Sequence, residues 1–149
     1  MPKPNQELSE WIDIIDDADF ISMGIGELLE IAAQKFPNTE ALNYSHQPDI
    51  KNICWTYKDL NEMSTNLARG FLTAGFSPGD TIAVWGPNHP EWILIEYALA
   101  KAGLKLATLN PLYKEKELIF ALNTSKVSGI MHADEIGGVE AIALIQSIL

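Results

Sequence analysis

The apolar positions of the chain follow two periods, one typical of strands and one typical of helices. Short apolar runs at residues 81–85, 104–109 and 127–132 are rich in strand-forming side chains and predict buried strands. Between them, residues 91–102 and 114–123 carry apolar side chains at helical spacing. A strand, a helix and a second strand in this order predict a parallel βαβ unit, whose crossover is almost always right-handed.

Turn-forming residues mark where these elements begin and end. The sequence Gly-Pro-Asn-His-Pro at residues 86–90 interrupts the first strand, and we interpret Asn88 as a helix cap and Pro90 as the first helical residue. Gly103 ends this helix. Asn110-Pro111-Leu112-Tyr113 follows the second strand and forms a similar strand-to-helix turn.

The first half of the chain has its own signals. Residues 25–36 form an amphipathic pattern that predicts a helix, and residues 40–44 and 52–56 predict two strands of a hairpin joined by a polar loop. Thr56 and Asp59 have the spacing of a capping box, with Asp in place of Glu, at the start of the next helix.

The resulting fold class is α/β, with a mainly parallel sheet and flanking helices. Gly137-Gly138 precedes an apolar helix predicted at residues 139–149, and a parallel pattern requires a further strand after it. We therefore expect an incomplete portion of a larger α/β domain. Residues 1–20 are expected to form an acidic lead-in, and residues 21–149 the partial α/β subdomain.

Charge and cysteine content restrict the function. The 149 residues carry a formal net charge of −10, and they contain no basic stripe, which argues against nucleic acids and anionic membranes as partners. The single cysteine, Cys54, permits no internal disulfide and no zinc cluster, as in proteins of reducing compartments. No signal peptide and no apolar run of about 18 residues is present, so we predict a cytoplasmic protein without a membrane span.

Candidate sites lie at the strand-to-helix turns. The chain has no Gly-rich phosphate loop and no Gly-x-Ser-x-Gly turn, and His46, His89 and His132 lack metal-ligand spacing, so no metal site is predicted. Gly86, Asn88 and His89 stand where a strand ends and a helix begins, a place that binds ligands and attracts anions. They are candidates for an anion-binding or pocket edge, although turn and cap chemistry alone also explains them.

The same two interpretations apply to residues 110–113. As a functional feature, Asn110-Pro111-Leu112-Tyr113 is a pocket edge with an aromatic platform, and as a structural one it is a turn.

Three ordered stretches resemble the N-terminal part of the AMP-forming acyl-CoA synthetases, within the adenylate-forming superfamily. They are Trp-Thr-Tyr-Lys-Asp-Leu at residues 55–60, the segment from Gly79 to Trp92, and the segment from Ala98 to Pro111. The continuation over residues 113–125 is similar to the fatty-acyl branch, and the whole resemblance covers residues 22–140.

The resemblance implies a parent enzyme that couples a fatty acid to CoA through an acyl-adenylate, using ATP and Mg²⁺. The family's phosphate loop, magnesium-linked Thr-Glu motif, ribose-binding Asp and catalytic Lys all follow the matched region, so no residue of this chain is assigned as catalytic. In some members the region after the second motif lies near the CoA nucleotide, which makes Asn110, Pro111, Leu112 and Tyr113 the predicted CoA edge. None of these cofactors is expected to bind tightly to this chain.

Two hypotheses for the chain follow. As an N-terminal fragment of a fatty-acid–CoA ligase, it should be inactive as 149 residues. The alternative is a non-enzymatic α/β module that pairs with another chain or weakly binds nucleotide or CoA. In both cases uncovered apolar faces predict self-association or a partner. An unrelated receiver-like or Rossmann-like domain is disfavoured, because Gly86 and Asn110 occupy the strand ends where acidic or Gly-rich sequences would stand.

Overall fold

The computed structural model describes residues 22–45 and 52–148. The predicted acidic lead-in, the hairpin loop over residues 46–51 and His46 lie outside the described residues. The described elements, in chain order, are α1 Ile25–Lys35, β1 Glu40–Tyr44, β2 Ile53–Thr56, α2 Tyr57–Thr73, β3 Thr81–Trp85, α3 Pro90–Ala102, β4 Lys105–Leu109, α4 Glu115–Thr124, β5 Gly129–His132, β6 Glu135–Ile136, β7 Val139–Glu140 and α5 Ala141–Ile148.

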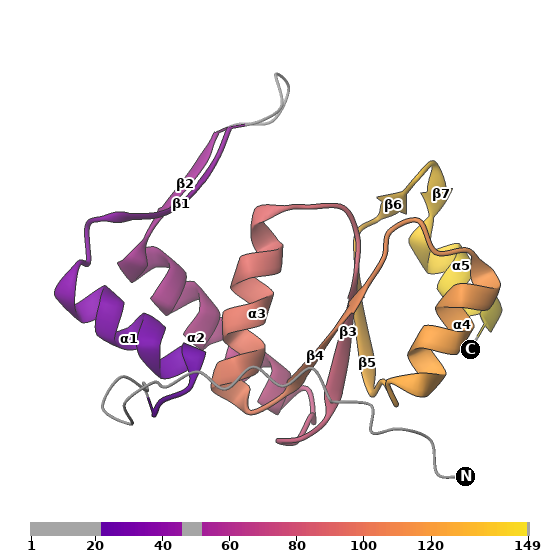
Figure 1. Cartoon of the computed structure of the whole chain (residues 1–149), viewed down its shortest axis with the longest axis horizontal. Coiled ribbons are helices and arrows are strands. Elements are labelled where there is room, and N and C mark those ends of the chain that lie inside the picture. Colours follow the sequence, from indigo (N-terminus) through magenta and orange to yellow (C-terminus); the bar gives the residue numbers. More distant parts are fainter. Residues whose placement is uncertain (1–21, 46–51, 149) are drawn as a thin grey trace, which may run out of the picture.

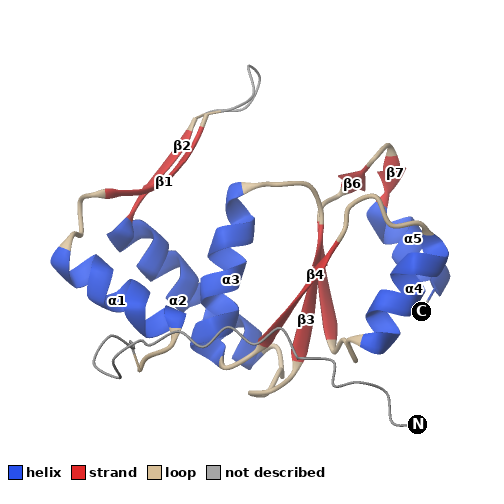
Figure 2. Cartoon of the chain, viewed as in Figure 1, coloured by secondary structure: helices blue, strands red, loops and turns tan. Residues whose placement is uncertain are grey.

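The elements form three layers, a parallel sheet with helices on each of its two faces (Figures 1 and 2). The sheet has the strand order β4-β3-β5, and β3 pairs in parallel with both neighbours. Helices α2 and α3 lie on one side of the sheet and α4 and α5 on the other, and α1 packs against α2 and α3. The antiparallel β1-β2 hairpin extends from the α1–α2 end, away from the sheet (Figure 1). The predicted α/β class and parallel sheet are confirmed.

Strand β3 supplies both halves of the hydrophobic core. Ile82 and Val84 pack in the cluster with α2 and α3, whereas Ala83 and Trp85 pack in the cluster with α4 and α5. All four are at most 4% exposed. Alternate side chains of a strand point to opposite faces, so burial on both faces requires the continuous apolar run seen in the sequence.

The predicted capping box of α2 is confirmed. The backbone N–H of Asp59 donates to Thr56 Oγ1 at 3.2 Å, and the N–H of Thr56 donates to Asp59 Oδ2 at 3.0 Å. Helix α3 begins with Pro90 as its first residue and ends at Gly103 in the left-handed region, as predicted. The interpretation of Asn88 as its cap was wrong: His89 holds the N-cap position, and its side chain makes no capping hydrogen bond.

The last predicted helix begins later than the pattern indicated. Gly137 and Gly138 have φ values of 60° and 80°, and they form the turn between β6 and β7, which pair antiparallel. Two successive residues with positive φ are what a tight hairpin turn requires, and glycine meets this without steric cost. Residues 139–140 therefore belong to a strand, and α5 starts at Ala141.

None of the helices over residues 22–45 and 52–148 is both long and apolar enough to cross a membrane.

Candidate functional site

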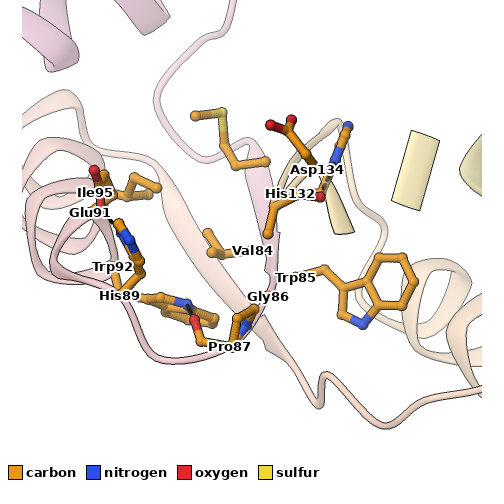
Figure 3. Close-up of a pocket in the computed structure, with 12 residues that line it drawn as sticks. Val84, Trp85, Gly86, Pro87, His89, Glu91, Trp92, Ile95, His132 and Asp134 are labelled. Carbon is orange, nitrogen blue, oxygen red and sulfur yellow. Dashed lines mark hydrogen bonds and ion pairs between the residues drawn. The ribbon is translucent and has the colours of Figure 1, made fainter. Parts of the chain in front are cut away.

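One pocket of the described structure opens at the carboxyl edge of the parallel sheet (Figure 3). We call it the carboxyl-edge pocket; its volume is about 390 Å³. It lies between the first turns of α3 and the residues at the end of β5, above the end of β3. Its lining residues are Val84, Trp85, Gly86, Pro87, His89, Glu91, Trp92, Ile95, Met131, His132, Ala133 and Asp134.

Strand order explains why a pocket forms here. Strands β3 and β5 are neighbours, but the chain leaves β3 toward α3 on one side of the sheet and leaves β5 toward α5 on the other. The two outgoing connections diverge and leave a crevice between the strand ends, and such crevices are where open α/β sheets bind ligands. The hydrophobic pattern could not reveal this position, because it does not specify that β5 lies beside β3.

Hydrogen bonds fix the wall that α3 contributes. His89 Nδ1 donates to the carboxylate of Glu91, and the indole N–H of Trp92 donates to the Pro87 carbonyl at 2.9 Å. The His89 ring also lies 5.6 Å from the Tyr44 ring of the hairpin, centroid to centroid. Behind His89, a smaller pocket of about 210 Å³ separates the hairpin from α3, and Asn88 lines that one.

The opposite wall comes from the end of β5. His132 Nδ1 donates to the Ala133 carbonyl at 2.9 Å, and the N–H of Ala133 donates to the Trp85 carbonyl at 3.1 Å. A Cβ on Gly86 would lie 3.2 Å from the Ala133 Cβ. Gly86 therefore allows the two strand ends to approach each other at the base of the pocket.

The second predicted edge, residues 110–113, lies at the end of β4 and outside the carboxyl-edge pocket. Asn110 Oδ1 accepts the N–H of Leu112 at 2.9 Å, and the Asn110 carbonyl accepts the indole N–H of Trp85 at 3.1 Å. These contacts hold the turn and link it to the core. Leu112 is 76% exposed, and Tyr113 lines a groove of about 460 Å³ along α4.

The predicted residues therefore divide among three hollows. Gly86 and His89 line the carboxyl-edge pocket, Asn88 lines the pocket behind it, and Tyr113 lines the α4 groove. His132 joins His89 in the carboxyl-edge pocket although the sequence separates the two widely.

Sequence reasoning missed several residues of the carboxyl-edge pocket: Glu91, Trp92, Met131, His132 and Asp134. The available signal was that His132 ends the third predicted strand and Asp134 follows it closely, and the carboxyl ends of parallel strands lie at one edge of the sheet. Over residues 22–45 and 52–148, no group of three or more His, Cys, Asp and Glu side chains is arranged to hold a metal ion.

Cys54 offers no activated thiol. Its side chain donates to the Glu40 carboxylate at 3.0 Å, and this hydrogen bond is the main cause that raises the pKa of the Cys54 thiol above its usual value. A thiol kept protonated is a poor nucleophile.

Comparison with known proteins gives the family. The profile of the family described as AMP-binding enzyme matches residues 29–148. The medium-chain acyl-CoA ligase ACSF2, mitochondrial, of Rattus norvegicus is 37% identical over 115 residues, which is 77% of this chain and 18% of the relative. YngI of Bacillus subtilis, which carries an acyl-CoA synthetase name, is 32% identical over 132 residues, 89% of this chain and 23% of the relative.

Solved structures agree on the fold. VinN in complex with 3-methylaspartate superposes with a TM-score of 0.74 at 20% identity, covering 85% of this chain and 33% of VinN. A fatty acyl CoA synthetase of Mycobacterium tuberculosis gives a TM-score of 0.70 at 23% identity, covering 84% and 23% of the two chains.

The chain belongs to the AMP-binding enzyme family. The predicted resemblance to the AMP-forming acyl-CoA synthetases is confirmed, since these relatives carry acyl-CoA ligase and acyl-CoA synthetase names. It spans about a fifth of the length of these curated relatives. One relative is named mitochondrial and another is bacterial, so a cytoplasmic location stays a prediction.

Proposed function

We propose that the chain is the N-terminal part of a fatty-acid–CoA ligase whose complete form uses ATP, Mg²⁺ and CoA to produce acyl-CoA, AMP and pyrophosphate. The observation that carries this proposal is the 37% identity to a medium-chain acyl-CoA ligase over 77% of the chain. The structural contribution of this part is the sheet edge with its pocket and the Asn110 turn beside it.

A chimera tests this function. The segment of rat ACSF2 that aligns with this chain is replaced by the chain's own residues, and acyl-CoA formation is measured with medium-chain fatty acids. An active chimera supports the proposal. A chimera that folds, as judged by circular dichroism and thermal unfolding, but forms no acyl-CoA contradicts it.

By itself, the 149-residue chain is proposed neither to form the acyl-adenylate nor to transfer the acyl group to CoA. It contains no Gly-rich phosphate loop to hold ATP. Incubation with a fatty acid, ATP, Mg²⁺ and labelled pyrophosphate should give no exchange above a no-protein control. Clear exchange by the purified chain would overturn this part of the proposal.

The turn at residues 110–113 is proposed as the edge that meets CoA. Leu112 is the best position for a test, because it is 76% exposed and its removal leaves the core intact. In the chimera, Leu112→Ala should raise KM for CoA severalfold with little change in kcat. Leu72→Ala is the matched control, since Leu72 is 46% exposed on α2. Equal effects of both changes would contradict the CoA edge.

A second candidate function, an α/β module that pairs with another chain, is favoured by the exposed side chains beside the α4 groove. Phe120 is 72% exposed in this groove and Leu112 is 76% exposed next to it. Sedimentation equilibrium of the 149-residue chain should show self-association that Phe120→Ser weakens and Leu72→Ser does not. A monomer at all concentrations would count against this function.

A further inference from the structure

The polar side chains that line the carboxyl-edge pocket donate their N–H groups to oxygens of the protein itself. What they leave for a ligand is mainly hydrogen-bond acceptors. His89 and His132 each use Nδ1 as a donor to a protein oxygen, in the first case the Glu91 carboxylate and in the second the Ala133 carbonyl. A neutral imidazole with its proton on Nδ1 presents an acceptor lone pair on Nε2. In its neutral form, each of these two lining histidines therefore carries an acceptor nitrogen.

The other side-chain donors of the lining are already engaged. The indole N–H of Trp92 donates to Pro87 at 2.9 Å, and the indole N–H of Trp85 donates to Asn110 at 3.1 Å. The side-chain hydrogen-bonding capacity left for a ligand consists of imidazole nitrogens and carboxylate oxygens.

The charge of the lining has one sign. Glu91 and Asp134 bring two carboxylates, and none of the twelve lining residues is Lys or Arg. Glu91 is held by His89, whereas the Asp134 carboxylate has no hydrogen-bond partner among the described residues, and Asp134 is exposed. Glu91 also occupies the first turn of α3, where it already supplies the negative charge that a helix N-terminus favours.

Below this rim the pocket is apolar. Val84 and Ile95 are buried at its base, and the half-buried side chains of Trp92 and Met131 form its sides. A volume of about 390 Å³ is in the range of small-molecule sites, which typically combine an apolar body with few polar groups.

From these features we infer that the carboxyl-edge pocket binds compounds with an apolar body and a hydrogen-bond-donating head, such as an alkylammonium or alkylamide, and that it disfavours carboxylates. The site is thus distinct from one for the fatty-acid carboxylate of the proposed ligase. It also differs from the anion edge predicted from Gly86, Asn88 and His89. An anion edge should bind a carboxylate more tightly than an ammonium, whereas the inferred site should bind the ammonium more tightly. The inference does not depend on the proposed function.

The titration uses three probes that share a six-carbon body: hexylammonium, hexanamide and hexanoate. The 149-residue chain carries ¹³C-methyl methionine, and the Met131 methyl signal reports occupation of the pocket. Met63 on α2, outside the lining, is the internal control. We expect hexylammonium to bind most tightly, hexanamide next, and hexanoate about tenfold or more weaker than hexylammonium, because the lining carries two carboxylates and no Lys or Arg.

Asp134→Asn tests the assignment of the head group. It should weaken hexylammonium binding by about two- to fivefold, the range of an exposed ion pair, and leave hexanamide binding nearly unchanged. Glu135→Gln is the matched control, because Glu135 is an exposed acid on the neighbouring β6 that does not line the pocket.

Three outcomes would overturn the inference. The first is hexanoate binding as tightly as hexylammonium, which is the result that an anion site predicts. The second is equal effects of Asp134→Asn and Glu135→Gln on hexylammonium binding. The third is no selective shift of the Met131 methyl with any of the three probes.

Discussion

Two glycines of the chain should respond in opposite ways to the same substitution. Gly103 has a φ of +70°, and a Cβ there would lie 3.2 Å from the Pro78 Cβ, whereas a Cβ on Gly70 in α2 meets nothing within 4 Å. Gly103→Ala should lower the free energy of unfolding by about 1–2 kcal/mol. Gly70→Ala should raise it by about 0.5–1 kcal/mol. Urea unfolding of both variants checks this, and a loss of stability in both would contradict it.

The Lys101 side chain on α3 makes hydrogen bonds to α2. Its Nζ donates to the Asn61 carbonyl at 3.1 Å, to Asn61 Oδ1 at 2.6 Å and to Thr65 Oγ1 at 2.8 Å. Burial is the main cause that lowers the pKa of Lys101. Lys101→Met should destabilise the protein by about 1–2 kcal/mol, because it removes three hydrogen bonds and leaves the half-buried Asn61 Oδ1 without a donor.

Lys105→Met is the control for Lys101→Met, since Lys105 is exposed on β4. Its effect on urea unfolding should stay within about 0.5 kcal/mol. Equal losses in the two variants would show that the hydrogen bonds of Lys101 have no special role.

At the scale of single elements, the start of α2 should make stability depend on pH. Hydrogen bonds from the Thr56 hydroxyl and N–H hold the pKa of Asp59 below its usual value. A carboxyl whose pKa is lower in the folded state stabilises the protein above its unfolded pKa, and this contribution is lost as pH falls through the folded pKa. The chain should thus exceed Asp59→Asn in stability at neutral pH, and the difference should shrink below pH of about 4.

Thermal unfolding across this pH range measures the difference between the chain and Asp59→Asn. The matched control is Glu62→Gln, because Glu62 makes only an exposed pair with Lys58 at 3.9 Å. A difference between the chain and Asp59→Asn that persists unchanged into strong acid would contradict the role of the Asp59 charge.

The elements themselves were well predicted wherever local chemistry decides them. Thr56 with Asp59, Pro90 and Gly103 act within one turn of chain, so the sequence contains all the information that places α2 and both ends of α3. The β6-β7 turn at Gly137-Gly138 was readable from its two glycines but was missed, because the apolar run after it favoured a helix.

The candidate site was only half predictable, because it depends on contacts between distant segments. Gly86 and His89 could be found from their place after a strand, but Met131, His132 and Asp134 join them only because β5 pairs with β3. That pairing follows from which side of the sheet each crossover helix covers, and no local pattern specifies it.

At the scale of the whole molecule, β3 should be the most protected segment. It is paired along both edges and packed on both faces, and Ile82, Ala83, Val84 and Trp85 are nearly inaccessible. Amides that exchange only after global unfolding are concentrated in such segments. Hydrogen exchange should be slowest in β3 and faster in the β1-β2 hairpin, whose residues are half-buried or exposed. Slower exchange in β4 or β5 than in β3 would contradict this.

The hydrogen bond from Trp85 to Asn110 makes the fluorescence of Trp85 sensitive to the turn at residues 110–113. Trp85 is 2% exposed, so its emission should lie at shorter wavelength than that of Trp55 and Trp92, which are half-buried. Its indole N–H contacts the carbonyl of the first residue in the proposed CoA edge. A molecule that displaces this turn would alter the polarity around the indole, and the emission maximum would record its arrival without an attached dye.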